Sequence, residues 1–187
     1  ALDAKLREAM QVELRQVHRK LGITFLLVTH DQTEAMVMSD RVLIMDRGRI
    51  VQDGTPAELY NNPVSPYVAS FLGTSNLLPA RVEALEDGLL VVRCGKGLLR
   101  IPRSTRDFGA GTRVLLAVRP EKCVIHGAAA QDAAPMGTLA GRVIEHHFHG
   151  SLVRSSVALG EAAPLLVDRQ LGTRGDLAAL LPSGSPC

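Results

Sequence analysis

A titratable side chain follows the most apolar run in the first part of the sequence. Residues 23–28 (ITFLLV) are continuously apolar, and Thr29, His30, Asp31 and Gln32 come directly after them. In open α/β sheets, ligands bind beyond the carboxyl ends of the strands. The imidazole of His30 titrates near physiological pH, so it can exchange a hydrogen bond or a proton with a phosphate or an attacking water. The plainer alternative for a single histidine is a helix cap or a structural contact.

Further histidines stand together in E-H-H-F-H, residues 145–149. Side chains two residues apart in a strand share one face, so Glu145, His147 and His149 could seat a transition metal. All of them lie in one short run without a fourth ligand, so we expect an exposed strand end. His147 and His149 therefore stay weak metal candidates. Arg119, in R-P-E, could bind an oxyanion, but we favour a structural ion pair or a turn.

The composition excludes several classes of protein. The 187 residues carry a net charge of +2, aromatic residues make up 3% and tryptophan is absent, so nothing indicates a nucleic-acid surface. No apolar run approaches the roughly 20 residues of a membrane span. Cys94, Cys123 and Cys187 are few and far apart, which favours a reducing cytosol over a disulfide framework or a zinc site.

The elements that must position His30 belong to an alternating α/β pattern. Apolar residues at helical spacing predict an amphipathic helix from Asp3 to Gly22. Residues 23–28 have the pattern of a strand covered on both faces, and residues 31–39 predict a short helix. Residues 41–46 and 49–52 predict a hairpin. Helices are expected to begin at the T-P-A-E capping box, residues 55–58, and at Ser65-Pro66.

The pattern changes near residue 75. Short β-like runs follow, separated by Gly, Pro and Asp at the spacing of a small barrel or sandwich, and residues 127–137 predict a mobile loop. The expected strands cover residues 77–84, 89–94, 98–101, 113–118, 123–126, 138–148, 152–159 and 164–167. We therefore predict an α+β chain with an α/β part at residues 1–75 and an all-β domain at residues 76–187.

The stretch V-T-H-D-Q-T-E-A-M-V-M-S-D-R-V-L-I-M-D-R-G-R-I-V-Q-D-G-T-P-A-E-L-Y resembles the C-terminal part of the ATP-binding subunits of bacterial ABC importers. The resemblance covers residues 1 to about 78 and implies that His30 is the switch histidine that reaches the γ-phosphate of ATP. A-L-D-A-K-L-R likewise resembles the D-loop of this family, with Asp3 as its aspartate. L-L-A-V-R-P-E (residues 115–121) and residues 139–157 resemble the accessory TOBE domain, which is built of oligonucleotide-binding-type barrels.

Several parts of the family's ATP site are missing from this sequence. It has no G-x-x-x-x-G-K-[ST] loop to hold phosphates and magnesium, and the family's signature loop and Walker B strand are also absent. We therefore expect a C-terminal piece of the ATPase whose intact form would use ATP and Mg²⁺. Phosphoryl transfer depends on positioned charge and metal, so this chain alone is predicted neither to hydrolyse ATP nor to bind it tightly.

The resemblance implies a peripheral subunit on the cytoplasmic face of the membrane, paired with a second copy and with membrane permease subunits, without a nucleic-acid partner. The exposed edge of the strand at residues 23–28 also favours pairing with another chain, so we predict either a dimer, with or without exchanged segments, or a disordered first part. The transported substrate stays open among polyamine, ferric iron, sulfate and sugar, with the first two favoured by the length of the β domain. The alternative function is a regulatory module whose β domain binds an oxyanion or a metal and whose helical part dimerises.

Overall fold

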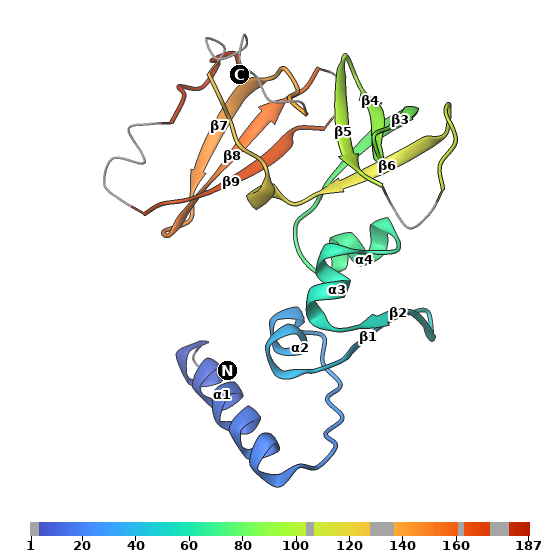
Figure 1. The fold of residues 1–187 in the computed structure, drawn as a ribbon. Helices are drawn as coiled ribbons and strands as arrows, with labels where there is room; N and C mark the ends of the chain where they lie inside the picture. The colour runs from blue at the N-terminus through green and yellow to red at the C-terminus, as the bar shows by residue number, and fades with distance from the viewer. Residues whose placement is uncertain (1–3, 104–106, 128–136, 161–162, 173–179) are drawn as a thin grey trace. The chain divides into compact units, whose positions relative to one another are not determined.

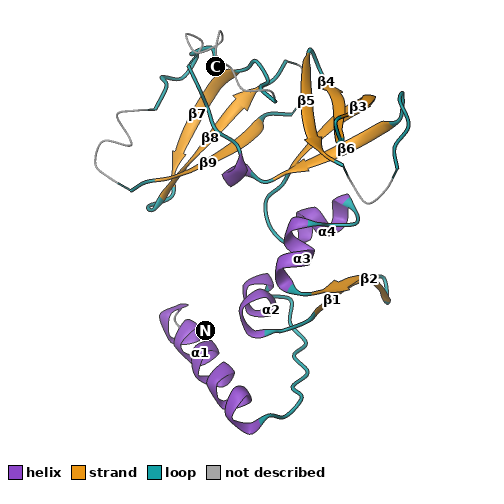
Figure 2. Cartoon of the chain, in the orientation of Figure 1, coloured by secondary structure: helices purple, strands orange, loops and turns teal. Residues whose placement is uncertain are grey.

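The computed structural model describes residues 4–103, 107–127, 137–160, 163–172 and 180–187. The chain forms two compact units, Ala1–Thr74 and Ser75–Cys187 (Figure 1). Helices occur in the first unit, while the described residues of the second form strands joined by loops and one 3₁₀ turn (Figure 2). The predicted α+β class with an all-β second part is therefore confirmed. No helix within the described ranges is both long and apolar enough to span a membrane.

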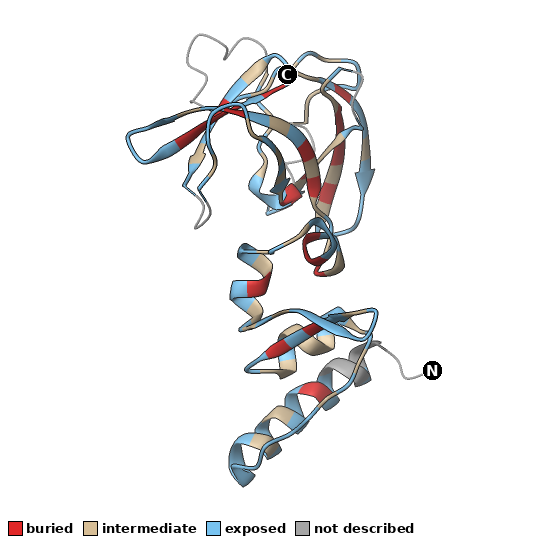
Figure 3. Cartoon of the chain, turned by 90° about the vertical axis from the view of Figure 1, so that its right-hand side faces the viewer, coloured by how far each residue is buried: buried red, intermediate tan, exposed pale blue. Residues whose placement is uncertain are grey.

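The N-terminal unit starts with α1 (Ala4–Leu21). The helix ends where predicted, because Gly22 adopts a positive φ of 63° and its N–H donates to the carbonyl oxygen of His18. The predicted apolar stripe lies exposed, and only Gln11 is buried among the described side chains of this helix (Figure 3). The members of this stripe are 43–61% exposed: Leu6, Met10, Leu14, Val17 and Leu21.

The predicted hairpin and the two helices after it are present. Strands β1 (Val42–Asp46) and β2 (Arg49–Gly54) pair antiparallel, and Arg47 and Gly48 both take the positive φ that a type I′ turn requires. Helix α3 (Pro56–Asn61) begins with the complete capping box, and α4 (Pro66–Phe71) begins at Ser65. The small core of this unit combines the inner face of β1 with both helices: Val42, Ile44, Leu59, Val68 and Leu72.

The strand predicted at residues 23–28 is not formed. These residues run without regular structure, and Phe25, Leu26 and Val28 are 56%, 83% and 89% exposed. A strand needs hydrogen-bonding neighbours, and no described strand of this unit lies beside the segment. The prediction of a switch-histidine strand was therefore wrong for this chain, and its pairing with another chain stays a prediction.

The C-terminal unit contains two antiparallel sheets. The four-stranded sheet has the order β5-β4-β3-β6, built from β3 (Asn76–Glu86), β4 (Leu89–Cys94), β5 (Gly97–Pro102) and β6 (Arg113–Val118). The three-stranded sheet has the order β7-β8-β9, built from β7 (Arg142–Phe148), β8 (Leu152–Ala158) and β9 (Leu165–Gln170). Alternate residues of the strands in the first sheet form one core, which also receives Leu139, Leu159 and Leu165.

A buried side chain joins the two sheets of this unit. Asn76, at the start of β3, is 6% exposed. Its Nδ2 donates to the carbonyl oxygen of Leu166 on β9, and its Oδ1 accepts from the N–H of Leu166, both at 2.8 Å. The amide therefore pairs with the backbone of a strand 90 residues further along the chain, as a neighbouring strand would.

The chain between the sheets differs from the prediction at residues 120–126, and the strand predicted from residue 138 begins only at Arg142. Residues 120–122 form a 3₁₀ turn, Pro120–Lys122, and the strand expected at residues 123–126 is not formed. Val124 is 73% exposed there, and no described strand pairs with the segment. The last residues add a short pairing instead, because Gly141 and Cys187 exchange two backbone hydrogen bonds at 2.7 and 2.9 Å.

Candidate functional site

His30 is exposed and lies between the irregular stretch at residues 23–28, called the extended segment below, and helix α2 (Gln32–Met38). Asp31 is the N-cap of this helix, and its Oδ1 accepts from the N–H groups of Thr33 at 2.8 Å and Glu34 at 3.2 Å. These bonds satisfy donors that a helix start leaves unpaired and place a carboxylate at the positive end of the helix dipole. The turn that carries His30 is thus fixed by the residue that follows it.

Thr29, which precedes His30, also stabilises this turn. Its hydroxyl donates to Oε2 of Glu34 at 2.8 Å and accepts from the N–H of Asp31 at 2.9 Å. Neighbours on both sides of His30 are therefore tied to the first turn of α2. The sequence reasoning missed the roles of Thr29 and Glu34; the signal was a hydroxyl before the histidine and a carboxylate four residues after it.

The imidazole of His30 itself makes no hydrogen bond within the part of the chain that the structure describes. Both ring nitrogens are available, one as a donor and the other as an acceptor in the neutral ring. Asp31 already occupies the N–H groups of Thr33 and Glu34, and the exposed imidazole is a polar group that this turn offers to a ligand. It can accept from a water or donate to an anionic oxygen such as that of a phosphate.

A cleft of about 980 Å³ opens beside His30 in the N-terminal unit. Side chains from α1, the extended segment, α2 and β1 line it, and most of them are apolar. Leu14, Val17, Phe25 and His30 are among these residues. The cleft is of a size that takes a small ligand, and three arginines, Arg15, Arg19 and Arg41, interrupt its mainly apolar lining.

The structure does not bring the other predicted site residues to His30. Asp3 lies outside the described residues. In the C-terminal unit, His147 Nε2 lies 3.1 Å from Glu145 Oε1, and both side chains are more than half exposed. His149 lies beyond the end of β7, so the expected alignment of the three side chains on one strand face is incomplete. Over the described ranges, no three side chains of His, Cys, Asp or Glu form a group that could hold a metal ion.

His146 has a role that sequence reasoning did not assign. Its Nδ1 lies 2.8 Å from the hydroxyl oxygen of Ser155 on β8, and its Nε2 lies 2.7 Å from the carbonyl oxygen of Leu181. A neutral ring that carries its proton on Nε2 satisfies both contacts, with Ser155 donating and Leu181 accepting. No sequence pattern marks this contact, since Leu181 lies 35 residues away.

Arg119 is buried, 8% exposed, and its Nη1 donates to the hydroxyl of Ser75 at 2.6 Å. Pro120 and Glu121 belong to the 3₁₀ turn that follows it. This geometry agrees with the favoured interpretation of R-P-E as a structural turn, because the guanidinium faces the protein interior rather than a ligand.

Comparison with known proteins gives one domain and a set of close relatives. Residues 116–185 match the TOBE domain. The spermidine/putrescine import ATP-binding protein of Methylococcus capsulatus is 43% identical over 166 residues, which cover 88% of this chain and 41% of the relative. The protein of the same name from Thermotoga maritima is 41% identical over 171 residues, covering 91% of this chain and 46% of the relative. The chain thus spans less than half the length of these relatives.

Proposed function

Since the chain carries a TOBE domain and is homologous over most of its length to ATP-binding subunits of ABC importers, as the sequence resemblance predicted, we propose that it serves an ATPase that energises solute uptake. The observation that carries the proposal is the identity of 43% over 88% of the chain, which includes the T-H-D-Q turn and the β domain together. The geometry of His30 is compatible with it, since hydrogen bonds of its neighbours fix the turn and no described residue bonds to the imidazole.

In this function His30 donates a hydrogen bond to the γ-phosphate of ATP, and the D-loop residue Asp3 contacts the second subunit. A hydrogen bond to an anionic oxygen is stronger than one between neutral groups, so a single exposed imidazole can report whether the terminal phosphate is present. Thr29, Asp31 and Glu34 act as positioning residues, because their hydrogen bonds fix the turn on both sides of the ring.

We propose that this chain contributes His30 to the ATP site but lacks the further groups that hold ATP and Mg²⁺ tightly. The sequence contains no G-x-x-x-x-G-K-[ST] loop, and the cleft beside His30 is mainly apolar. We therefore propose that this chain alone neither hydrolyses ATP nor binds it tightly. The assembly that does so would be a homodimer bound to permease subunits at the cytoplasmic face of the membrane. ATP hydrolysis by the purified chain above the buffer background would refute its proposed inactivity.

The proposed cargo is a polyamine. The relatives from Methylococcus capsulatus and Thermotoga maritima are both named as spermidine/putrescine import proteins, and each matches at least 88% of the present chain. A separate binding protein and the permease choose the cargo in such systems, so the support comes from these relatives rather than from a site in the structure.

The experiment measures uptake of labelled spermidine and putrescine in the source cells after His30→Ala is introduced into the chromosomal gene. The matched control is His149→Ala, an exposed histidine of the β unit. We expect His30→Ala to abolish ATP-dependent uptake and His149→Ala to leave it unchanged. Polyamine uptake that survives His30→Ala would refute the role of His30, and polyamine uptake that survives deletion of the gene would refute the polyamine assignment.

A further inference from the structure

Three arginines form a row across the four-stranded sheet of the C-terminal unit. Arg81 on β3 lies directly opposite Arg93 on β4 and directly opposite Arg113 on β6. Residues that oppose each other in an antiparallel pair point to the same face of the sheet. The three guanidinium groups therefore project from one face, at Cα positions that span about two strand spacings, or roughly 10 Å.

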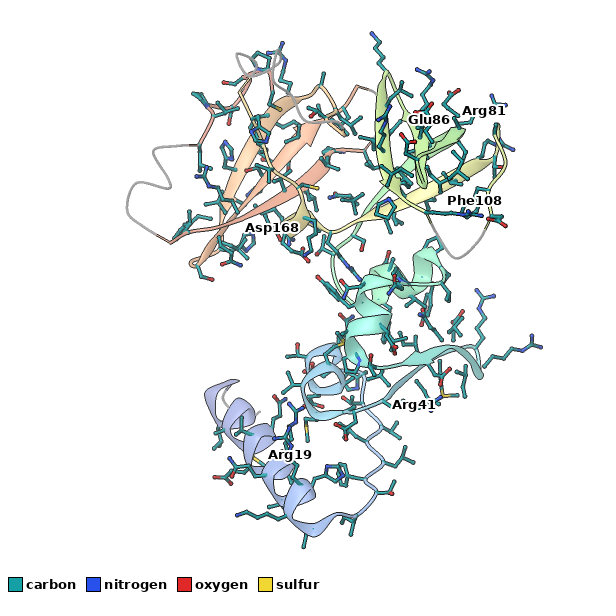
Figure 4. All side chains as sticks on the ribbon, viewed as in Figure 1. Arg19, Arg41, Arg81, Glu86, Phe108 and Asp168 are labelled. Carbon is teal, nitrogen blue, oxygen red and sulfur yellow. The ribbon has the colours of Figure 1, made fainter. Side chains whose placement is uncertain are left out.

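The row lies on the solvent-facing side of this sheet. Val82 and Val92, the neighbours of Arg81 and Arg93 along their strands, are 1% and 0% exposed in the core. Since successive side chains alternate between the two faces, the arginines point away from that core, and all three are exposed. Arg81 is labelled on β3 in Figure 4, on the same strand as Glu86.

The carboxylates of this sheet neutralise only part of the positive charge of the arginine row. Glu83 binds Arg93 at 2.7 Å, and Glu86 binds Arg100, outside the row, at 3.1 Å. Over the described residues, Arg81 and Arg113 have no carboxylate partner. Like charges directly opposite each other in a sheet are destabilising, so this arrangement lowers the stability of the free protein.

Arg81 is held in place by a backbone contact. Its Nε donates to the carbonyl oxygen of Gly111 at 3.1 Å, and the adjacent N–H of Gly111 donates to the carbonyl oxygen of Val82 at 2.7 Å. The loop before β6 thus fixes one donor of the guanidinium, and no described residue bonds to its two terminal nitrogens. A fixed arginine loses less conformational freedom when it binds an anion than a mobile one does.

We propose that Arg81 and Arg113, with Arg93 beside them, form a binding site for a phosphate-bearing anion. Guanidinium groups bind phosphate oxygens through paired N–H donors, and two of them on adjacent strands suit an anion that offers several such oxygens. The site lies in the β unit and does not depend on the proposed ATPase role of His30. A free polyphosphate and a lipid headgroup carry the same chemistry.

The test measures binding of pyrophosphate to the full chain by titration calorimetry at low salt, and binding to vesicles with and without phosphatidylglycerol. The variants are Arg81→Gln, Arg113→Gln and the double variant. Arg100→Gln is the control, because it removes the same charge from the same sheet but lies outside the row and pairs with Glu86. Each row variant should weaken binding roughly tenfold, and Arg100→Gln should change it less than twofold.

Stability separates loss of binding from loss of folding. Without anion, Arg113→Gln should melt at the same temperature as wild type or higher, because it relieves like-charge repulsion and removes no contact as specific as the hydrogen bond of Arg81 to Gly111. Pyrophosphate should raise the melting temperature of wild type but not of the double variant. Binding to phosphatidylglycerol vesicles alone would identify a lipid headgroup as the source of the phosphate. Equal weakening by Arg100→Gln, or no binding of either probe by wild type, would overturn the proposal.

Discussion

Replacing Asn76 should weaken the connection between the two sheets of the β unit and lower its stability. Its amide makes two hydrogen bonds of 2.8 Å to the backbone N–H and C=O of Leu166, and it is 6% exposed. Asn76→Ala leaves both backbone groups without this partner. An unsatisfied buried group costs about 1–3 kcal/mol, and Leu166 is only partly buried, so water recovers some of the loss. We expect a destabilisation of about 2–4 kcal/mol.

The assay is urea unfolding of the full chain followed by circular dichroism, together with hydrogen exchange of the Leu166 N–H. With a slope of about 2 kcal/mol per molar urea, the midpoint of the β unit should fall by roughly 1–2 M. Asn76→Asp should also destabilise, because its carboxylate loses the donor and faces the carbonyl oxygen of Leu166. The exchange of the Leu166 N–H should become faster in Asn76→Ala.

The matched control is Asn61→Ala. Asn61 is exposed, and its Nδ2 makes a single hydrogen bond of 2.9 Å to the carbonyl oxygen of Ala57 within α3. Removing it should change stability by no more than about 0.5 kcal/mol. If Asn76→Ala stays within that range, or if the Leu166 N–H exchanges at the wild-type rate, Asn76 does not join the sheets as argued.

Three further predictions concern local features. Hydrogen bonds from the backbone N–H and hydroxyl of Thr55 lower the pKa of Glu58, so this interaction stabilises the fold above the pKa of an unfolded glutamate and is lost as the pH falls through the lowered value. An NMR titration should place the Glu58 midpoint below that of a free glutamate, and Thr55→Ala should raise it part of the way. Gly141→Ala should destabilise by about 1–3 kcal/mol in urea unfolding, since its Cβ would lie 2.6 Å from Val157 Cγ1 and 3.0 Å from the carbonyl oxygen of Ala158, whereas Gly109→Ala, which meets nothing within 4 Å, should have a far smaller effect. Burial raises the thiol pKa of Cys94, Cys123 and Cys187, so iodoacetamide should label the folded chain more slowly at neutral pH than the unfolded chain, with a rate that rises at higher pH than for an exposed thiol.

Local structure was predictable wherever a short stretch of sequence contained its own hydrogen-bond partners. The capping box at Thr55 and Glu58, the turn at Arg47-Gly48 and the end of α1 at Gly22 formed as predicted. Each depends on contacts within about four residues, so the residue types alone decide them. The turn around His30 belongs to the same class, because Asp31 caps the helix that begins with the next residue.

The predicted strand at residues 23–28 failed because a strand is completed by its neighbours. The apolar pattern correctly reports residues suited to burial, but no described strand of the N-terminal unit supplies hydrogen bonds to them. The segment at residues 123–126 failed for the same reason. The apolar pattern of a segment indicates that its residues would fit in a sheet. It does not indicate whether neighbouring strands are present to pair with them.

The sequence by itself determined the capped helices, the hairpin and the alternating strands of this protein, together with the family resemblance that directs attention to His30. Tertiary structure alone decided the contacts between distant segments. It paired Asn76 with Leu166, placed His146 against Leu181, and aligned Arg81 with Arg93 and Arg113. Strand register sets these contacts, and register follows from the packing of the whole sheet rather than from any one strand.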